Sequence, residues 1–177
     1  QPTVKSWGSV LEASYIAHFL PPWFRNYGKR VVKTPKFYFY DAALVNLLTR
    51  QPDAGSALAG PIGGALLEGW VVIEAVKAFM SLGRKPDLYF WRSHGGLEVD
   101  LLIVIDGKLQ LVEIKLTATP GAGHVEPINR FLAVAGDEAC QQGILVCRTE
   151  SEQALPNGHV AMPWKSFPDW LRKRLSG

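Results

Sequence analysis

The stretch that most constrains the fold is a predicted β-hairpin over residues 98–116, EVDLLIVIDGKLQLVEIKL. Two runs rich in Val, Ile and Leu flank the pair Asp106-Gly107. An Asp-Gly pair between two apolar runs strongly favours a tight turn, because both central positions of such a turn take up backbone angles that Asp and Gly tolerate. We therefore expect two antiparallel strands joined by these two residues.

The register of this hairpin brings acidic residues together. With Asp106 and Gly107 as the loop, Asp100 lies opposite Glu113, and Glu98 lies opposite Lys115. Asp100, Glu113 and Lys115 then share one face, since side chains alternate along a strand. Opposed Cβ atoms are about 4.5–5.5 Å apart, so like charges there repel. A shared proton, the Lys115 ammonium or a divalent cation would relieve the repulsion, and an acid pair that reaches solvent beside a lysine is the alternative.

A third carboxylate comes from the segment Gly64 to Gly83, which predicts one helix ended by glycine. An α-helix turns by about 100° per residue, and at this spacing Glu68 falls on the apolar side of the predicted helix. A core-facing carboxylate is seldom left without a partner. The alternative is an acid near the helix start, favoured by the helix dipole and in reach of water. The apolar side carries Val71, Val72, Ala75 and Phe79, and the solvated side carries Glu74, Lys77 and Ser81.

An acidic helix residue, a strand Asp and Glu-x-Lys on the next strand are here Glu68, Asp100 and Glu113-Ile114-Lys115. This order resembles the PD-(D/E)xK, or restriction-endonuclease-like, nuclease superfamily, although Val99 stands where the motif has proline. Nearly the whole chain also resembles the C-terminal domain of unknown function in many bacterial and archaeal AAA+-type ATPases. The phrases that carry this second resemblance are LPPWFRNYGKRVVKTPKFYFYDAAL, GALLEGWVVIEAV, YFWRSHGGLEVDLLI and LVEIKL.

The resemblance implies an α/β fold with a mixed central sheet flanked by helices. It also implies a Mg²⁺- or Mn²⁺-dependent nuclease in which Asp100, Glu113 and the Ile114 carbonyl hold the metal. Glu68 would complete the metal shell, directly or through water, and Lys115 would orient the attacking water and stabilise developing negative charge.

Nucleic acid is one expected partner. Arg92 lies near the acidic strand, and Asn129 and Arg130 fall on a predicted helix that borders the substrate in related nucleases, so all three are candidate contacts to DNA. Residues 21–36 mix basic and aromatic side chains, which suits nucleic acid, but a hairpin turning at residues 26–29 explains the same pattern. The mildly basic net charge of +3 is compatible with DNA.

Two other functions stay open. The chain is expected to be attached to an AAA+ ATPase domain of the same longer protein, and it could be a non-catalytic module that binds DNA or a protein and regulates that ATPase. It could also be a structural assembly domain in which Lys115 pairs with Glu98 and Glu113. Oligomers are compatible with each of the three functions. The loop at residues 50–64 lacks a Gly-Lys-Ser/Thr sequence, so we expect no ATP site within this chain.

We expect residues 1–36 to form an N-terminal helix and hairpin, a possible winged-helix remnant, and residues 37–177 to form the nuclease-like domain. Further expected helices span residues 4–13, 41–48, 127–135 and 166–175, and further strands span 15–20, 37–40, 87–93, 143–148 and, at an edge, 160–162.

A content of 47% hydrophobic and 20% charged residues is typical of a soluble globular domain. No apolar run is long enough for a bilayer, and Cys140 and Cys147 suit reduced thiols, so a cytoplasmic protein without membrane partners is expected.

Overall fold

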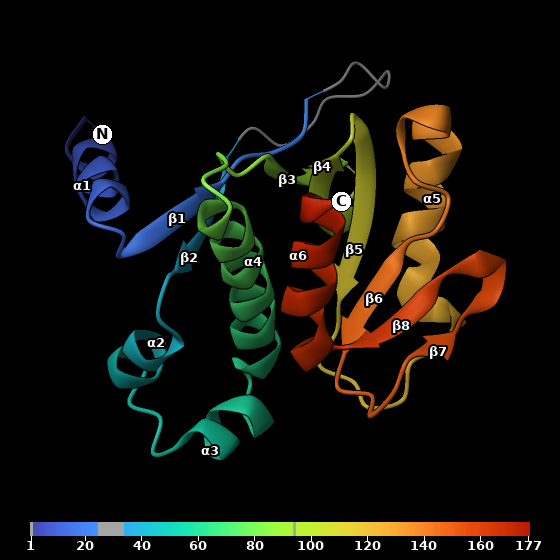
Figure 1. The fold of residues 1–177 in the computed structure, drawn as a ribbon. Helices are drawn as coiled ribbons and strands as arrows, with labels where there is room; N and C mark the ends of the chain where they lie inside the picture. Colours follow the sequence, from blue (N-terminus) through green and yellow to red (C-terminus); the bar gives the residue numbers. More distant parts are fainter. Residues whose placement is uncertain (1, 25–33, 94) are drawn as a thin grey trace.

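The computed structural model describes residues 2–24, 34–93 and 95–177. These residues form a six-stranded mixed sheet with helices on both faces, beside a separate two-stranded sheet (Figure 1). The expected α/β fold is confirmed. In chain order the elements are α1 (Pro2–Ala13), β1 (Ala17–Leu20), β2 (Lys36–Phe39), α2 (Ala42–Leu48), α3 (Ala54–Ala59), α4 (Gly63–Ser81), β3 (Leu88–Arg92), β4 (Glu98–Ile105), β5 (Lys108–Ile114), α5 (Glu126–Ala135), β6 (Ile144–Cys147), β7 (Gln153–Ala154), β8 (Val160–Pro163) and α6 (Phe167–Ser176).

Between the turn and Leu101 the central hairpin has the register that the sequence predicts, and the regular pairing ends before Asp100. β4 pairs with β5 from Ile105 opposite Lys108 to Leu101 opposite Val112. Asp106 and Gly107 form the turn with φ of 51° and 76°, the positive angles that a two-residue hairpin loop requires. β3 pairs antiparallel with β4, so β3, β4 and β5 form an antiparallel meander.

The rest of the large sheet is parallel where the chain crosses over through a helix. β6 follows α5 and pairs parallel with β5, and β8 pairs parallel with β6. The strand order is β3-β4-β5-β6-β8-β7. Parallel neighbours need a crossover connection of this kind, and the segment with α5 supplies it between β5 and β6.

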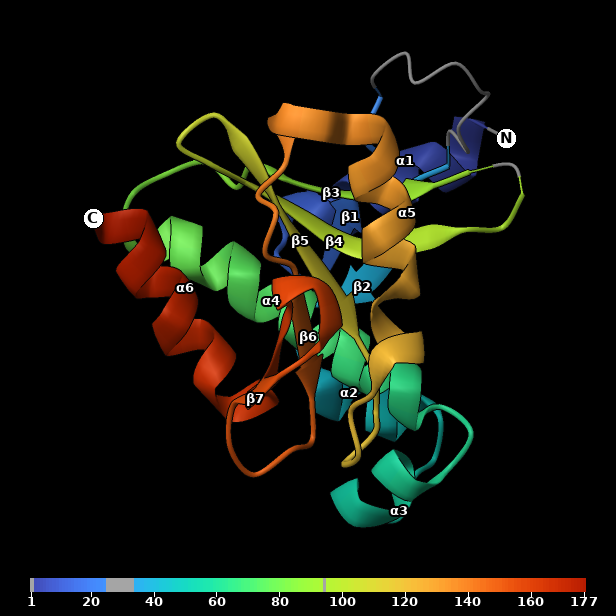
Figure 2. The ribbon, with the colours of Figure 1, turned by 90° about the vertical axis from the view of Figure 1, so that its right-hand side faces the viewer.

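Helices cover the large sheet on both faces, so its central strands are apolar on both sides. α4 and α6 lie on one face and α5 on the other (Figures 1 and 2). Under α4, Val71 and Phe79 pack in one core with Leu101 of β4, and under α5, Phe131 packs in a second core with Leu111 of β5. The predicted apolar side of α4 is therefore buried as expected, and Glu74 and Lys77 form a 2.8 Å ion pair on its other side.

Two predicted elements are wrong in detail. The segment 50–64 is not entirely a loop, because it contains the whole of α3. The Asp53 carboxylate accepts a hydrogen bond from the Ser56 N–H at 2.9 Å and caps this helix, whose small residues give no hydrophobic periodicity.

The strand at 160–162 is not an edge strand, because β7 pairs with β8 on its outer side. With only two residues, β7 is too short for a sequence pattern to indicate it.

The small sheet lies beside α4. β1 pairs antiparallel with β2, and Asp41 caps α2. The predicted turn at residues 26–29 lies outside the described residues.

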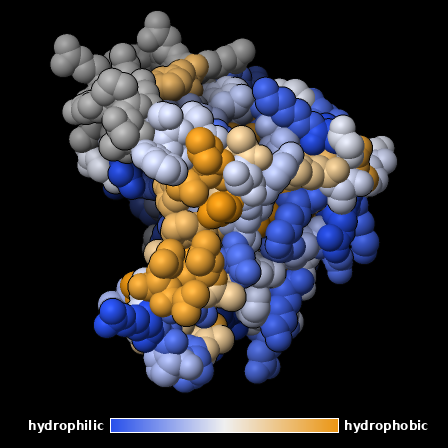
Figure 3. All heavy atoms as spheres, turned by 90° about the vertical axis from the view of Figure 1, so that its left-hand side faces the viewer, coloured by the Kyte–Doolittle hydropathy of each residue, from blue (hydrophilic) through white to orange (hydrophobic). Residues whose placement is uncertain are grey.

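On the side of the molecule where β2 and α2 lie, apolar side chains reach the surface (Figure 3), including Leu47, which is 74% exposed, and Leu48, which is 61% exposed. None of the helices within the described ranges has the length and apolar character that a membrane crossing requires.

Candidate functional site

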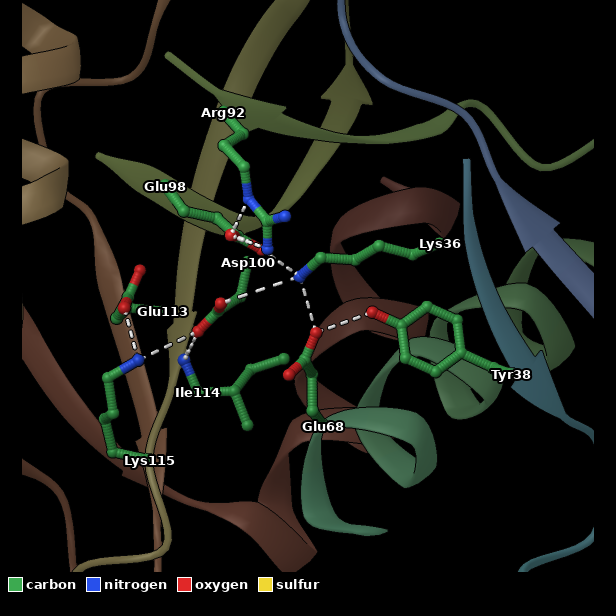
Figure 4. Close-up of polar contacts among 9 residues, drawn as sticks. All are labelled: Lys36, Tyr38, Glu68, Arg92, Glu98, Asp100, Glu113, Ile114 and Lys115. Atoms are coloured by element: carbon green, nitrogen blue, oxygen red, sulfur yellow. Dashed lines mark hydrogen bonds and ion pairs between the residues drawn. The ribbon is translucent and has the colours of Figure 1, made fainter. Parts of the chain in front are cut away.

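The four residues that the sequence singles out, Glu68, Asp100, Glu113 and Lys115, line one open cleft of about 460 Å³ at an end of the hairpin (Figure 4). α4 contributes Glu68, β4 contributes Asp100, and β5 with the residue after it contributes Glu113 and Lys115. Side chains from α4, β4 and the end of β5 therefore converge on this cleft.

A β-bulge in β4 sets the position of Asp100. Tyr89 pairs with Leu102 and Trp91 with Val99, so two steps along β3 face three steps along β4. The Asp100 carboxylate accepts the N–H of Ile114 at 3.0 Å, and the regular pairing of β4 with β5 ends next to it. Bulges commonly redirect a side chain next to a functional site. The bulge here turns a buried carboxylate toward the end of β5.

Glu113 and Asp100 share the Lys115 ammonium. Lys115 Nζ lies 2.5 Å from Glu113 Oε1 and 3.2 Å from Asp100 Oδ2 (Figure 4). Burial, and then repulsion from Asp100, raises the pKa of Glu113 to about 8, and burial raises the pKa of Asp100. Burial alone would lower the pKa of Lys115, but the two carboxylates outweigh it and raise that pKa. The predicted ammonium partner is therefore present, and a shared proton stays compatible with the raised carboxyl pKa values.

Glu68 is held by two donors from β2. The Tyr38 hydroxyl and the Lys36 ammonium each donate to Glu68 Oε1 at 2.6 Å. Burial and the neighbouring Glu68 carboxylate raise the pKa of Tyr38, so its hydroxyl keeps the proton that it donates. The expectation that a core-facing carboxylate has a partner is confirmed. The partners come from a segment about 30 residues earlier in the sequence.

Glu98 joins the cluster in a different way from the one predicted. Its carboxylate contacts the Arg92 guanidinium and the Lys36 ammonium, not Lys115. The prediction that Glu98 lies against Lys115 fails because the regular β4–β5 pairing stops at Leu101 and the β4 chain turns away beyond the bulge. Carboxylate oxygens of Glu68, Glu98 and Asp100 lie within 4.8 Å of one another, an arrangement that could hold a metal ion.

The donor set fits a hard divalent cation. Carboxylate oxygens are the ligands that Mg²⁺ prefers in proteins. Glu113 Oε2 is buried and has no hydrogen-bond partner among the residues that the structure describes, and a buried carboxylate oxygen without a partner is costly. If all groups are ionised, four carboxylates face three cations among the residues that the structure describes, which leaves one negative charge uncompensated within that set. The carboxylates are Glu68, Glu98, Asp100 and Glu113, and the cations are Lys36, Arg92 and Lys115.

The three candidate DNA contacts are all engaged within the protein. Arg92 pairs with Glu98 at the cleft, and Arg130 makes a 2.7 Å ion pair with Glu126. The Asn129 amide oxygen lies 3.0 Å from His159 Nε2, and His159 Nδ1 accepts the N–H of Gly143.

Burial lowers the pKa of His159, so the neutral ring fits both bonds and Asn129 serves as its acceptor. Roles of these residues in DNA binding stay predictions.

Sequence reasoning missed Lys36 and Tyr38 and gave Glu98 the wrong partner. Lys36 stands at the end of a basic stretch in which nothing marks one lysine as different from the others. The one sequence feature that could have identified them is the alternation of side chains along β2, which places Lys36 and Tyr38 on the same face of that strand.

Residues 63–167 match a family described as "Domain of unknown function (DUF4143)", and residues 1–54 match one described as "Domain of unknown function (DUF8612)". The uncharacterized proteins Rv2008c of Mycobacterium tuberculosis and Mb2031c of Mycobacterium bovis are each 33% identical to this chain over 120 residues. That stretch is 68% of this chain and 26% of each relative, so the chain spans about a quarter of the curated relatives that it matches. Neither their names nor the family descriptions state an activity.

Proposed function

Since this chain belongs to the DUF4143 family, whose description names no activity, we propose from the geometry of its cleft that it is a Mg²⁺- or Mn²⁺-dependent nuclease domain. It would hydrolyse phosphodiester bonds and act as part of a longer AAA+-type ATPase. The observation that carries the proposal is the convergence of Asp100, Glu113 and Lys115 in one cleft, where a buried oxygen of Glu113 has no hydrogen-bond partner among the described residues.

Asp100, Glu113 and the Ile114 carbonyl would hold the metal, and Glu68 would complete its shell. A bound divalent cation would lower the pKa of a water molecule and neutralise phosphate charge. The chain itself supplies the rest of the chemistry. The Ile114 N–H fixes one oxygen of Asp100, and Tyr38 fixes one oxygen of Glu68, so two carboxylates are oriented before any ligand arrives.

Lys115 is the candidate for positioning the attacking water. Its side chain is 40% exposed, so the ammonium reaches solvent in the cleft while it contacts Asp100 and Glu113. Its raised pKa keeps it cationic through the neutral range, which suits the stabilisation of negative charge that develops on a phosphate oxygen.

The second candidate is a non-catalytic module that binds DNA or a protein and regulates the attached ATPase. The contact of Lys36 with Glu68 and Glu98 favours it, because an internal cation balances part of the negative charge of the cluster without a metal. The short span of this chain relative to its relatives is compatible with either function.

The test is cleavage of supercoiled plasmid and of labelled single- and double-stranded oligonucleotides, with Mg²⁺, with Mn²⁺ and with EDTA. We expect metal-dependent cleavage that Asp100→Asn abolishes. Asp106→Asn is the matched control, because it makes the same change in the turn of the same hairpin, where Asn adopts a positive φ readily.

Cleavage that survives in Asp100→Asn, or that needs no metal, would contradict the proposal. Salt-dependent DNA binding without cleavage would favour the regulatory module.

A further inference from the structure

The Lys36 ammonium lies among the three carboxylates that could hold a metal. Its Nζ is 2.6 Å from Glu68 Oε1 and 3.8 Å from Asp100 Oδ1, and it contacts Glu98 Oε1 (Figure 4). The Lys36 side chain is 16% exposed, and its ammonium lies 5.3 Å from the centre of the Phe90 ring. A largely buried cation therefore lies at the centre of the acidic cluster.

A divalent cation and this ammonium need the same oxygens. Carboxylate oxygens within 4.8 Å of one another repel unless a positive charge lies between them, and Lys36 supplies that charge. A divalent cation bound to the same three oxygens would lie within a few ångströms of the ammonium and repel it strongly. Glu113 lines the same cleft, and its buried Oε2, which has no hydrogen-bond partner among the described residues, is a further candidate ligand for a cation.

We propose that Lys36 is the built-in counter-ion of the Glu68–Glu98–Asp100 cluster, and that a divalent cation enters the cluster only by displacing the Lys36 ammonium. This inference rests on the proposed function for the presence of a metal. The nuclease resemblance gives no role to Lys36 or to Glu98. Here Lys36 is the counter-ion that a metal displaces, and Glu98 is a metal ligand.

The displacement couples two parts of the chain. Lys36 belongs to the part that matches the DUF8612 description, whereas the carboxylates belong to the part that matches DUF4143. Lys36 is the first residue of β2, and Tyr38, two residues on, holds Glu68. Metal binding thus removes one of the two contacts between β2 and Glu68 and leaves the Tyr38 hydroxyl to hold that carboxylate in position.

The first test uses the unmodified protein. Lysines are acetylated briefly with and without saturating Mn²⁺, and the labelling of Lys36 is compared with that of Lys77 by peptide mass spectrometry. Lys77 is a suitable internal reference because its side chain is 54% exposed and pairs with Glu74 on the other side of α4. We expect labelling of Lys36 relative to Lys77 to rise several-fold with Mn²⁺. An unchanged ratio at a Mn²⁺ concentration that saturates binding would overturn the inference.

The second test measures affinity. We expect Lys36→Met to bind Mn²⁺ about tenfold more tightly than wild type in calorimetric titrations, because the competing charge is gone. Lys77→Met, which removes a lysine outside the cluster, should leave the affinity unchanged. Thermal unfolding with and without Mn²⁺ checks folding, and Mn²⁺ should raise the melting temperature of Lys36→Met more than that of wild type.

The outcomes separate this inference from the nuclease proposal. Equal affinities of wild type and Lys36→Met would overturn the inference and leave the nuclease proposal standing. No binding by either folded protein would overturn both. Tighter binding by Lys36→Met, with Lys36 released in wild type but no cleavage of any nucleic acid, would support the inference and contradict the nuclease.

Discussion

Glu113 makes the metal-free protein less stable as the pH rises. The pKa of its carboxyl is raised by burial from 4.5 to about 8 in the folded state, and its side chain is 2% exposed. A carboxyl whose pKa is raised on folding contributes stability that is fully present below its unfolded pKa and is lost as the pH rises through its folded pKa. The loss therefore falls between pH 4.5 and about 8.

The size of the effect follows from the same shift. The pKa of Glu113 differs by about 3.5 between the unfolded and folded states, and each pKa unit corresponds to about 1.36 kcal/mol. As Glu113 ionises between pH 4.5 and pH 9, the free energy of unfolding should therefore fall by an amount whose upper value is on the order of 5 kcal/mol. Glu113→Gln keeps the shape of the side chain and cannot ionise. The free energy of unfolding of wild type relative to that of Glu113→Gln should therefore fall by up to this amount between pH 4.5 and pH 9.

The assay is urea unfolding in EDTA, followed by tryptophan fluorescence, at several pH values from 4.5 to 9. Glu126→Gln is the control, because Glu126 is 51% exposed and its pairing with Arg130 has little effect on stability at any of these pH values. A stability difference between wild type and Glu113→Gln that stays constant over this range would refute the reasoning. A wild type that gains relative stability with pH would show that Lys115 lowers the pKa of Glu113.

Three further predictions concern the residues around the cleft and the sheet. Tyr38→Phe should lower the free energy of unfolding by about 1.5–3 kcal/mol, because Glu68 loses a charged hydrogen bond, and urea unfolding with no change would contradict the role of the hydroxyl. Gly107→Ala should cost about 1 kcal/mol by the same measurement and leave metal affinity intact, since φ is 76° there, and a loss of metal binding would show that the turn does more than join two strands. Asn129→Ala should cost about 1–3 kcal/mol because His159 loses its acceptor, whereas a loss of DNA affinity at unchanged stability would instead support Asn129 as a DNA contact.

The hairpin and its neighbours were predictable because their signals are local. The Asp106-Gly107 turn fixes the register of β4 and β5, and the apolar periodicity of α4 fixes the face on which Glu68 lies. The register was enough to expect Asp100 near Glu113, whereas the expectation that Glu68 joins them came from the resemblance to a nuclease superfamily. The resemblance to a nuclease superfamily added roles for these residues, and those roles stay predictions.

The rest of the cluster depends on contacts between segments far apart in the sequence. Lys36 and Tyr38 reach Glu68 only because β2 lies alongside α4, and no local pattern encodes that contact. The bulge that separates Glu98 from Lys115 is equally hidden, because one extra residue in a run of apolar side chains leaves no mark in the sequence. α3 was missed because its small residues carry no periodicity, although Asp53 stands where a helix cap is common.

The most direct test of the central claim, that these carboxylates form a metal site, is calorimetric titration of Mn²⁺ and Mg²⁺ into wild type, Asp100→Asn and Asp106→Asn. We expect saturable binding by wild type and by Asp106→Asn, and its loss in a folded Asp100→Asn. The absence of binding by folded wild type, or binding that Asp100→Asn leaves unchanged, would contradict it.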